Sequence, residues 1–370
     1  MNADLRAALE SIEDPQLDLP IGVVGMLGEI RETRSTATVE LVVPIATWPT
    51  AELLTAQVER TIHDVRGVAG SVEVRAMNEH EVRHVRSVLR ERMAGADGET
   101  HGEATAPFLA RGATTRVLGI SSGKGGVGKS SVTVNLAISL AALGHRVGVL
   151  DADVYGFSIP KMVAAAVEPV VLGDTVIPTY AHGARWLSMG WFVDDDQPVI
   201  WRGPLLHKAI SQFVTEAWWG EPDYLLIDMP PGTGDVALTL SEVIPAVEIY
   251  VVTTPQPAAQ RVAQRSALAA KKLRLSVRGV VENMSWFDGD DGTRYELFGA
   301  GGGASLSADL GVPLLAQLPL VPSIREGGDD GTPVTVSAPH GATSERFAAL
   351  ATRIVAQGPA RVYRQELRLG

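Results

Sequence analysis

The 370-residue sequence contains no cysteine. Disulfide bonds are therefore excluded, and so is every metal or cluster site whose ligands are thiolates. The absence of cysteine thus bears directly on which metals or clusters the chain can hold.

Long apolar segments are absent as well. The sequence has no stretch of about 20 consecutive apolar residues, which is the length that a helix needs to cross a bilayer. The N-terminus opens with charged, helix-forming residues and lacks the pattern of a secretory leader. We therefore expect no membrane-spanning helix and a cytoplasmic protein.

Positive charge is in deficit, with 32 lysines and arginines against 43 aspartates and glutamates. The formal net charge is −11 at pH 7. A surface of this sign repels the phosphates of nucleic acids and of anionic lipids. The composition therefore predicts neither nucleic acid nor membrane as a binding partner.

The chain is long enough for two domains, and its pattern changes along the sequence. Residues 1–78 mix helix-like and β-branched segments, which is typical of a small α+β domain. Residues 79–114 are charged and then rich in glycine, alanine and threonine, which indicates a helix and a flexible linker. Residues 115–358 alternate apolar strands with helices, and residues 359–370 form a C-terminal tail.

The alternating region predicts an α/β fold with a parallel sheet flanked by helices. Several candidate strands are continuous apolar runs, as expected for strands that are buried on both faces. Ligands of such folds bind at the carboxyl ends of the strands. The candidate strands are residues 117–121, 147–151, 224–228, 249–254, 277–283 and 314–317.

The first of these strands leads into a phosphate-binding loop. Residues 123–130 read Gly-Lys-Gly-Gly-Val-Gly-Lys-Ser, which fits the pattern of Gly, any four residues, Gly, Lys and Ser or Thr. Glycines let backbone N–H groups turn toward phosphate oxygens, and the following helix presents its positive dipole end. The pattern predicts that Lys129 reaches the β- and γ-phosphates and that Ser130 binds Mg²⁺. We expect nucleotide contacts from Gly123, Lys124, Gly125, Gly126, Val127, Gly128, Lys129, Ser130 and Ser131.

Two further strand ends carry carboxylates. The strand that ends at Asp151 continues into Asp153, and Asp228 follows three apolar residues of another strand. A carboxylate in this position can bind Mg²⁺ or order the water that attacks a phosphate. We assign Asp151 and Asp228 to the magnesium site together with Ser130. The alternative is that these acids only cap the ends of their strands.

A second motif points to different chemistry. Residues 80–84 read His-Glu-Val-Arg-His, which matches the zinc-protease pattern His-Glu-X-X-His. Its charged Arg83 and its position beside the predicted linker favour a solvated helix instead. A zinc hydrolase is the less favoured alternative.

The motifs together resemble those of one family. The extra lysine of the loop, Lys124, is typical of the "deviant" loop of MinD-like ATPases. The wider set resembles the Mrp branch of these ATPases, also called ApbC, whose members are described as iron–sulfur cluster carriers. The resemblance covers roughly residues 115–355 and includes residues 123–131, 151–156, 202–205, 228–235, 281–285 and 322–328.

This resemblance implies a MinD-like P-loop NTPase fold that binds ATP with Mg²⁺, hydrolyses ATP and acts as a homodimer. Lys124 would contact the nucleotide of the second subunit, Asp153 would position the attacking water, and Asn283 would contact adenine. Together with Lys129, the first two would be the catalytic residues. The implied partners are iron–sulfur apoproteins, onto which clusters are loaded, or assembly factors.

Residues 1–78 also resemble the small iron–sulfur assembly domain that is often fused to this family, through residues 14–17 and 67–68. The chain departs from both patterns where cysteines are expected. Acids and glycines of residues 286–295, among them Asp288, Asp290 and Asp291, replace a Cys-X-X-Cys motif, and Trp48 precedes Pro49 where a cysteine is usual. Iron–sulfur clusters are held mainly by cysteine thiolates. Two possibilities therefore stay open, a carrier that loads clusters and an ATP-gated adaptor that binds none.

Overall fold

The computed structural model describes residues 3–93, 108, 113–154, 156–164, 168–192, 203–232 and 235–360. Most of the predicted linker, Arg202 and nearly all of the predicted tail lie outside these residues. Among the helices that the structure describes, none is long and apolar enough to cross a membrane.

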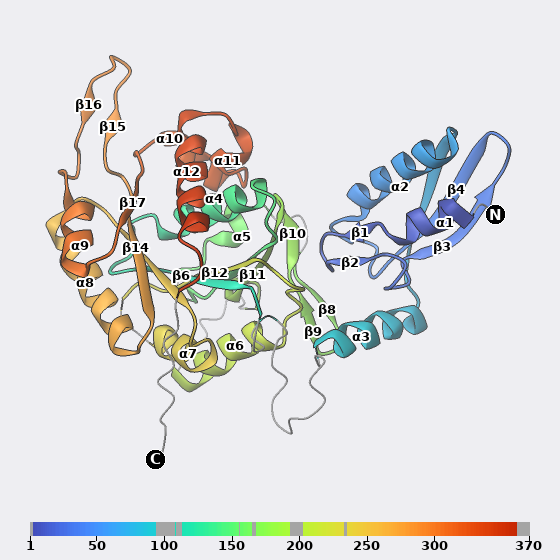
Figure 1. The fold of residues 1–370 in the computed structure, drawn as a ribbon, viewed down its shortest axis with the longest axis horizontal. Coiled ribbons are helices and arrows are strands. Elements are labelled where there is room, and N and C mark those ends of the chain that lie inside the picture. Colours follow the sequence, from blue (N-terminus) through green and yellow to red (C-terminus); the bar gives the residue numbers. More distant parts are fainter. Residues whose placement is uncertain are drawn as a thin grey trace.

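The N-terminal unit is a small three-stranded sheet covered by helices (Figure 1). Strand β4 is antiparallel to β3 and parallel to β5. Apolar side chains at helical spacing on α2, such as Leu54, Val58 and Ile62, are fully buried in its core. Its elements are α1 (Ala3–Glu10), β1 (Glu13–Asp14), β2 (Leu19–Pro20), β3 (Leu27–Glu32), β4 (Thr36–Val43), α2 (Ala51–Arg66), β5 (Ala69–Ala76) and α3 (Glu79–Met93).

The larger unit is built on an eight-stranded sheet in the order β10-β11-β7-β12-β6-β13-β14-β17. All neighbouring strands are parallel except the β10–β11 pair at one edge. The predicted α/β fold with a preceding α+β domain is thereby confirmed. The strands are β6 (Arg116–Ser122), β7 (Val147–Asp151), β10 (Thr179–Ala181), β11 (Ala184–Ser188), β12 (Tyr224–Asp228), β13 (Glu248–Thr253), β14 (Ser276–Glu282) and β17 (Leu314–Gln317).

Helices cover both faces of this sheet, which explains its nearly continuous apolar strands. One buried cluster joins the strands to α6, α7, α8 and α9, and the other joins them to α4, α5, α11 and α12. Two small hairpins, β8 (Val170–Leu172) with β9 (Thr175–Ile177) and β15 (Phe287–Asp288) with β16 (Arg294–Tyr295), project from the unit. The helices are α4 (Lys129–Ala142), α5 (Ile159–Met162), η2 (Met189–Phe192), α6 (Gly203–Thr215), α7 (Asp235–Val243), α8 (Pro257–Lys272), α9 (Gly302–Leu310), α10 (Pro322–Asp329), α11 (Val334–Ser337) and α12 (Ala342–Ala356).

The six predicted strands are all present, and three have the predicted bounds. Strand β11 was not predicted, because its sequence places a charged arginine inside a short strand. The buried Arg185 donates to the carbonyls of Pro15, at 3.1 Å, and of Trp219, at 2.9 Å, and pairs with Asp18 at 3.0 Å. Its charge is thus satisfied largely by residues of the N-terminal unit, which a local sequence pattern cannot reveal.

The two units pack against each other through apolar side chains. Val170, Leu172 and Ile177 of the β8–β9 hairpin belong to the same buried cluster as residues of α1, α2 and α3. Trp218 joins this cluster, and its indole N–H donates to the carbonyl of Leu17 at 2.6 Å. The N-terminal unit is therefore docked on the larger unit by a shared core.

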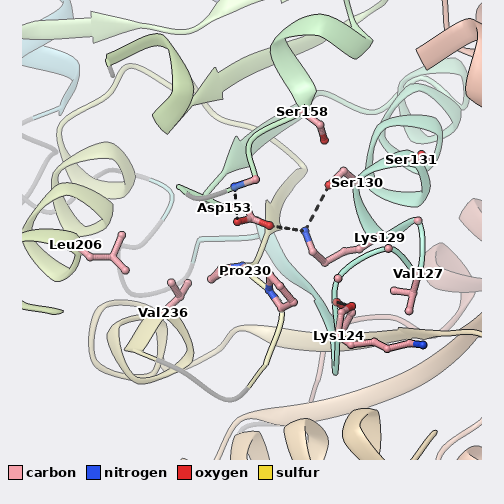
Figure 2. Close-up of a pocket in the computed structure, with 16 residues that line it drawn as sticks. Lys124, Val127, Lys129, Ser130, Ser131, Asp153, Ser158, Leu206, Pro230 and Val236 are labelled. Atoms are coloured by element: carbon pink, nitrogen blue, oxygen red, sulfur yellow. Dashed lines mark hydrogen bonds and ion pairs between the residues drawn. The ribbon is translucent and has the colours of Figure 1, made fainter. Parts of the chain in front are cut away.

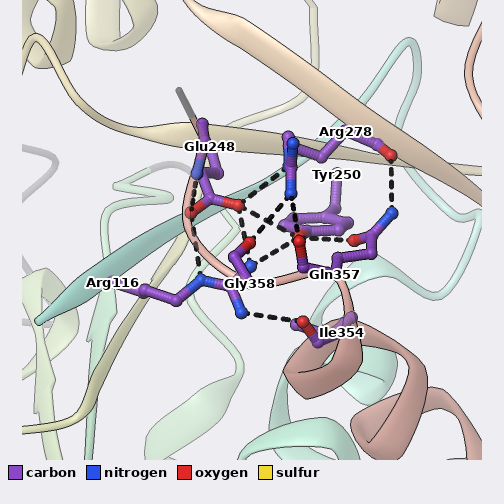
Figure 3. Close-up of polar contacts among 8 residues, drawn as sticks. Arg116, Glu248, Tyr250, Arg278, Ile354, Gln357 and Gly358 are labelled. Carbon is purple, nitrogen blue, oxygen red and sulfur yellow. Dashed lines mark hydrogen bonds and ion pairs between the residues drawn. The ribbon is translucent and has the colours of Figure 1, made fainter. Parts of the chain in front are cut away.

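A buried ionic network lies at the amino ends of β6 and β13 (Figure 3). The carboxylate of Glu248 accepts hydrogen bonds from Arg116, at 3.0 and 2.8 Å, and from Arg278, at 3.1 Å. Arg116 also donates to the carbonyl of Ile354 at 2.7 Å, and Arg278 donates to that of Gly358 at 2.8 Å. Glu248 therefore ties three strands to the end of α12.

The phosphate-loop sequence lies between β6 and α4, and α8 holds its first residue. A Cβ at Gly123 would lie 2.2 Å from the backbone nitrogen of Ala263 in α8. Gly126 and Gly128 both have φ of +78°, in the left-handed region that favours glycine. The shape of the loop thus depends on glycine for two separate reasons, close approach and backbone conformation.

Replacing Gly123 by alanine should destabilise the fold by about 1–3 kcal/mol, because α8 must move to admit the methyl group. The matched control is Gly125→Ala, since a Cβ at Gly125 meets nothing within 4 Å and its φ is not positive. Urea denaturation of both variants measures the difference. Equal stability of the two variants would show that α8 does not restrict the loop.

Replacing Glu248 by alanine should lower the free energy of unfolding by about 3–5 kcal/mol, because the buried guanidinium of Arg116 and the half-buried guanidinium of Arg278 lose their counter-charge. Glu296→Ala, at an exposed position of the β15–β16 hairpin region, should change it by less than about 0.5 kcal/mol. Chemical denaturation followed by circular dichroism gives both values. A Glu248→Ala variant as stable as the control would contradict the role assigned to the network.

Candidate nucleotide site

A cavity of about 630 Å³ opens at the carboxyl ends of the central strands (Figure 2). The loop of residues 124–128 and the start of α4 form one wall. Asp153 and Ser158 follow β7, and Pro230 and Pro231 follow β12 on the other side. The pocket therefore lies at the carboxyl ends of the strands, where open α/β sheets usually bind ligands.

Asp228 is the centre of the hydrogen bonds at this pocket. Its fully buried carboxylate accepts from Lys129 Nζ at 2.6 Å and from Ser130 Oγ at 2.6 Å through the same oxygen. The second oxygen accepts from Thr133 Oγ1 at 2.6 Å. Lys129 compensates the buried negative charge, and all three donors are held on one side of β12.

Asp151 and Asp153 occupy different positions although they are two residues apart. Asp151 is fully buried at the end of β7 and accepts from Ser188 Oγ at 3.0 Å. Burial and the nearby Asp228 raise the pKa of Asp151 to about 7, although Lys129 opposes this shift. A divalent cation near it would favour its ionised form. Asp153 instead lines the pocket, with its Oδ2 4.0 Å from Lys129 Nζ.

Lys124 has a different orientation from Lys129. Its Nζ donates to Oε1 of Gln256 at 3.1 Å, at the residue before α8. Figure 2 shows the amine directed away from that of Lys129. Lys124 is therefore placed at the rim of its own pocket rather than over its floor.

A second hollow, of about 460 Å³, continues from the phosphate loop. It shares Gly128, Ser131 and Ser158 with the first pocket and is lined further by Met162, Asn283 and other residues. The side-chain amide nitrogen of Asn283 donates to the carbonyl of Val127 at 2.9 Å. This bond orients the amide so that Oδ1 remains available as an acceptor.

The structure thus brings the loop, Asp151, Asp153 and Asp228 together, with Asn283 on the far side of the loop. Sequence reasoning missed three residues, Thr133, Ser188 and Gln256. Thr133 lies one helical turn after Lys129, and this i, i+4 spacing was a usable signal. Ser188 gave none, because its strand was not predicted.

The His-Glu-X-X-His sequence has a structural role. Asn78 caps α3 by accepting from the backbone nitrogens of His80, at 2.9 Å, and Glu81, at 3.1 Å. Glu81 accepts in return from Asn78 N at 2.8 Å, and two hydrogen bonds from Arg75 lower its pKa to about 2. This is a capping box, and it leaves Glu81 unsuited to act as a base. Nowhere in the described residues do three or more His, Asp or Glu side chains form a metal-binding group.

The acids of the β15–β16 hairpin also serve the local structure. Asp288 pairs with Arg294 at 2.8 Å and accepts from the indole of Trp286 at 2.9 Å. Asp291 accepts from the backbone and the hydroxyl of Thr293. The hairpin is therefore a solvated turn closed by its own side chains.

Comparison with protein families assigns both units. A model described as an iron-transfer P-loop NTPase matches residues 113–355, and a model described as an iron-sulfur cluster assembly protein matches residues 2–74. The chain is similar to an iron-sulfur cluster carrier protein of Mycobacterium tuberculosis, at 40% identity over 95% of this chain and 92% of the relative. The corresponding protein of Bacillus subtilis is 39% identical over 86% of this chain and 87% of its own.

Solved structures give the same fold. A nucleotide-binding protein from Archaeoglobus fulgidus, in complex with ADP, has a TM-score of 0.53 and 32% identity over 63% of this chain and 91% of its own. The cell-division ATPase MinD of Pyrococcus furiosus has a TM-score of 0.53 at 24% identity, over 65% of this chain and 99% of its own, and supports the fold alone. With both units matched and full-length relatives at about 40% identity, the chain belongs to the Mrp/ApbC family of iron–sulfur cluster carrier proteins, which are MinD-like P-loop NTPases.

Proposed function

We propose that this protein is an ATP-hydrolysing homodimeric switch that serves iron–sulfur protein biogenesis. The observation that carries the proposal is the arrangement around Asp228. Lys129 and Ser130 share one carboxylate oxygen there, at the floor of a pocket walled by the phosphate loop. These residues are those that a P-loop uses for phosphate and magnesium.

The residues present fit Mg²⁺, because the donors at this site are a hydroxyl and carboxylates, which are hard ligands. Bound Mg²⁺ would neutralise phosphate charge. Ser130 would be a direct ligand, and Asp228 and Asp151 would hold the ion's water shell. Lys129 would exchange its contact with Asp228 for phosphate oxygens. Asp153, which lines the pocket 4.0 Å from Lys129, would orient the attacking water.

The proposed dimer rests on Lys124. Its amine donates to Gln256 and is directed away from Lys129, so it lies at the rim of the pocket of its own subunit. Two copies that face each other through their phosphate loops would each supply a cation to the other's nucleotide. Such a cation stabilises the charge that develops on the transferred phosphate.

The second hollow would accept the base. Its Asn283 amide is fixed by Val127, which leaves Oδ1 to accept a hydrogen bond. The amino group of adenine is a donor at its six-position, whereas guanine presents a carbonyl there. This geometry favours ATP over GTP.

The cluster is the cargo of this family, and the residues of this chain do not fit it through thiolates. The two places where cysteines were expected hold Trp48 and the hairpin acids, which are engaged in hydrogen bonds of the fold. This observation favours a second form of the function, in which the dimer is an adaptor and client or assembly proteins hold the cluster. A carrier that loads clusters onto apoproteins remains the first form.

Lys129→Ala should weaken ATP binding, because the loop loses its phosphate ligand. Lys124→Ala should keep ATP binding but lower the turnover number by roughly a hundredfold or more, since the lost cation acts on the transition state. Nucleotide-binding calorimetry and phosphate release measure the two effects. Lys208→Ala, at an exposed position of α6, is the control. Wild-type hydrolysis by both loop variants would refute the ATPase proposal.

Mixing Lys124→Ala with Lys129→Ala tests the dimer directly. The Lys129→Ala subunit still carries Lys124 and can complete the site of the other subunit. Random pairing should restore roughly a quarter of the wild-type rate. A mixture no more active than its two components would contradict the shared site and leave hydrolysis within one subunit.

Anaerobic incubation with iron and sulfide separates the two forms of the function. The isolated protein should form no stable cluster, because it has no thiolate to offer. Absorption spectra after desalting provide the measurement, and a cysteine-containing relative such as an assembly scaffold provides the positive control. A stable cluster that passes to an apoprotein would exclude the adaptor form.

A further inference from the structure

Helix α8 carries a concentration of positive charge on an acidic protein. Residues 249–281 contain six lysines and arginines and no aspartate or glutamate, in a chain of net charge −11. Five of these cations are exposed, namely Arg261, Arg265, Lys271, Lys272 and Arg274. Within the part of the chain that the structure describes, none of the five forms an ion pair with a carboxylate.

These cations border an apolar hollow. A depression of about 490 Å³ is lined by Arg265, Leu268, Ala269, Lys271 and Lys272. The side chain of Leu268 is 46% exposed there. This depression has an apolar floor and positively charged edges. It would therefore suit a peptide segment in which acidic residues flank an aliphatic side chain.

The opposite side of α8 contacts the nucleotide loops. Ala263 lies against Gly123 of the phosphate loop. Ser266 donates to the carbonyl of Gly232, in the loop after β12, at 2.9 Å. Gln256, just before the helix, holds Lys124. A molecule bound on the outer side of α8 would be about one helix diameter, roughly 10 Å, from these loops.

We propose that the outer face of α8, defined by Arg261, Arg265, Leu268, Lys271 and Lys272, is a docking surface for an acidic segment of a partner protein. Charge complementarity selects an acidic occupant, and Leu268 adds a place for an aliphatic side chain. The net negative charge of the whole chain disfavours an extended polyanion, whose phosphates would continue beyond one helix onto repulsive surface. In Figure 1 α8 lies at the outer edge of the larger unit, beside α9.

The test uses a fluorescein-labelled peptide of glutamates and aspartates with two central leucines, added to the full-length protein at physiological salt. Fluorescence anisotropy should show saturable binding to the wild type. Reversing Arg261, Arg265 and Lys272 to glutamate should weaken binding by about tenfold or more. Leu268→Ser, which leaves the charge unchanged, should weaken it by about threefold or more, and so should replacing the peptide's leucines by serine.

The matched control reverses Arg34, Arg60 and Lys208, which are exposed elsewhere and change the total charge equally. This variant should bind the peptide within about twofold of the wild type. An equal loss in both charge-reversed variants would show mere long-range attraction and overturn the proposal. So would absence of binding, or tighter binding to a single-stranded oligonucleotide or to phosphatidylserine vesicles under the same conditions.

A second copy of the chain is the other possible occupant. Size-exclusion chromatography with light scattering, without nucleotide, tests this: loss of a wild-type dimer in the α8 variant alone would reassign the surface to self-association. Because none of these measurements requires ATP turnover, their failure is distinguishable from failure of the proposed ATPase.

Discussion

The contact between Asp228 and Lys129 is the constraint on which the site depends. A fully buried carboxylate is costly unless it is paired and hydrogen-bonded, and Asp228 accepts from Lys129, Ser130 and Thr133. Two of these donors, Lys129 and Ser130, are the residues that a P-loop uses for phosphate and magnesium. The fold therefore holds these three side chains of α4 against the carboxylate at the end of β12, beside the pocket that the phosphate loop lines.

Helix α8 adds a second constraint on the same loops. Its backbone meets Gly123 at a distance that no other residue permits, while Ser266 reaches Gly232 in the loop after β12. The first residue of the phosphate loop and the loop after the acidic strand are thus attached to one rigid element. Both loops therefore contact the inner side of α8, whereas its outer side carries exposed cations such as Arg261 and Arg265.

Local chemistry allowed much of the site to be predicted from sequence. The spacing of the glycines and the lysine predicts the phosphate loop, and the position of the acids after apolar runs predicts that they lie at strand ends. The strands of the parallel sheet are themselves recognisable as apolar runs. Strand β11 could not be predicted because Arg185 interrupts its apolar pattern. The carboxylate that neutralises this arginine belongs to Asp18 of the N-terminal unit, far away in sequence. Gln256 was missed for a similar reason. Its role is defined only when the fold brings the start of α8 to Lys124.

At the two positions where the family resemblance predicts cysteines, other side chains fill the space and form contacts. The indole of buried Trp48 donates to Asp14 at 2.8 Å, and Thr50 donates to the same oxygen at 2.7 Å. In the other region Asp288 and Arg294 close the hairpin, and Arg294 lies over the ring of Trp286 at 4.4 Å. Both replacements add contacts that a small thiol could not make. These two positions therefore serve the packing of the fold, whereas the residues that line the candidate nucleotide pocket, among them Lys124, Lys129 and Asp153, keep the P-loop pattern of the family.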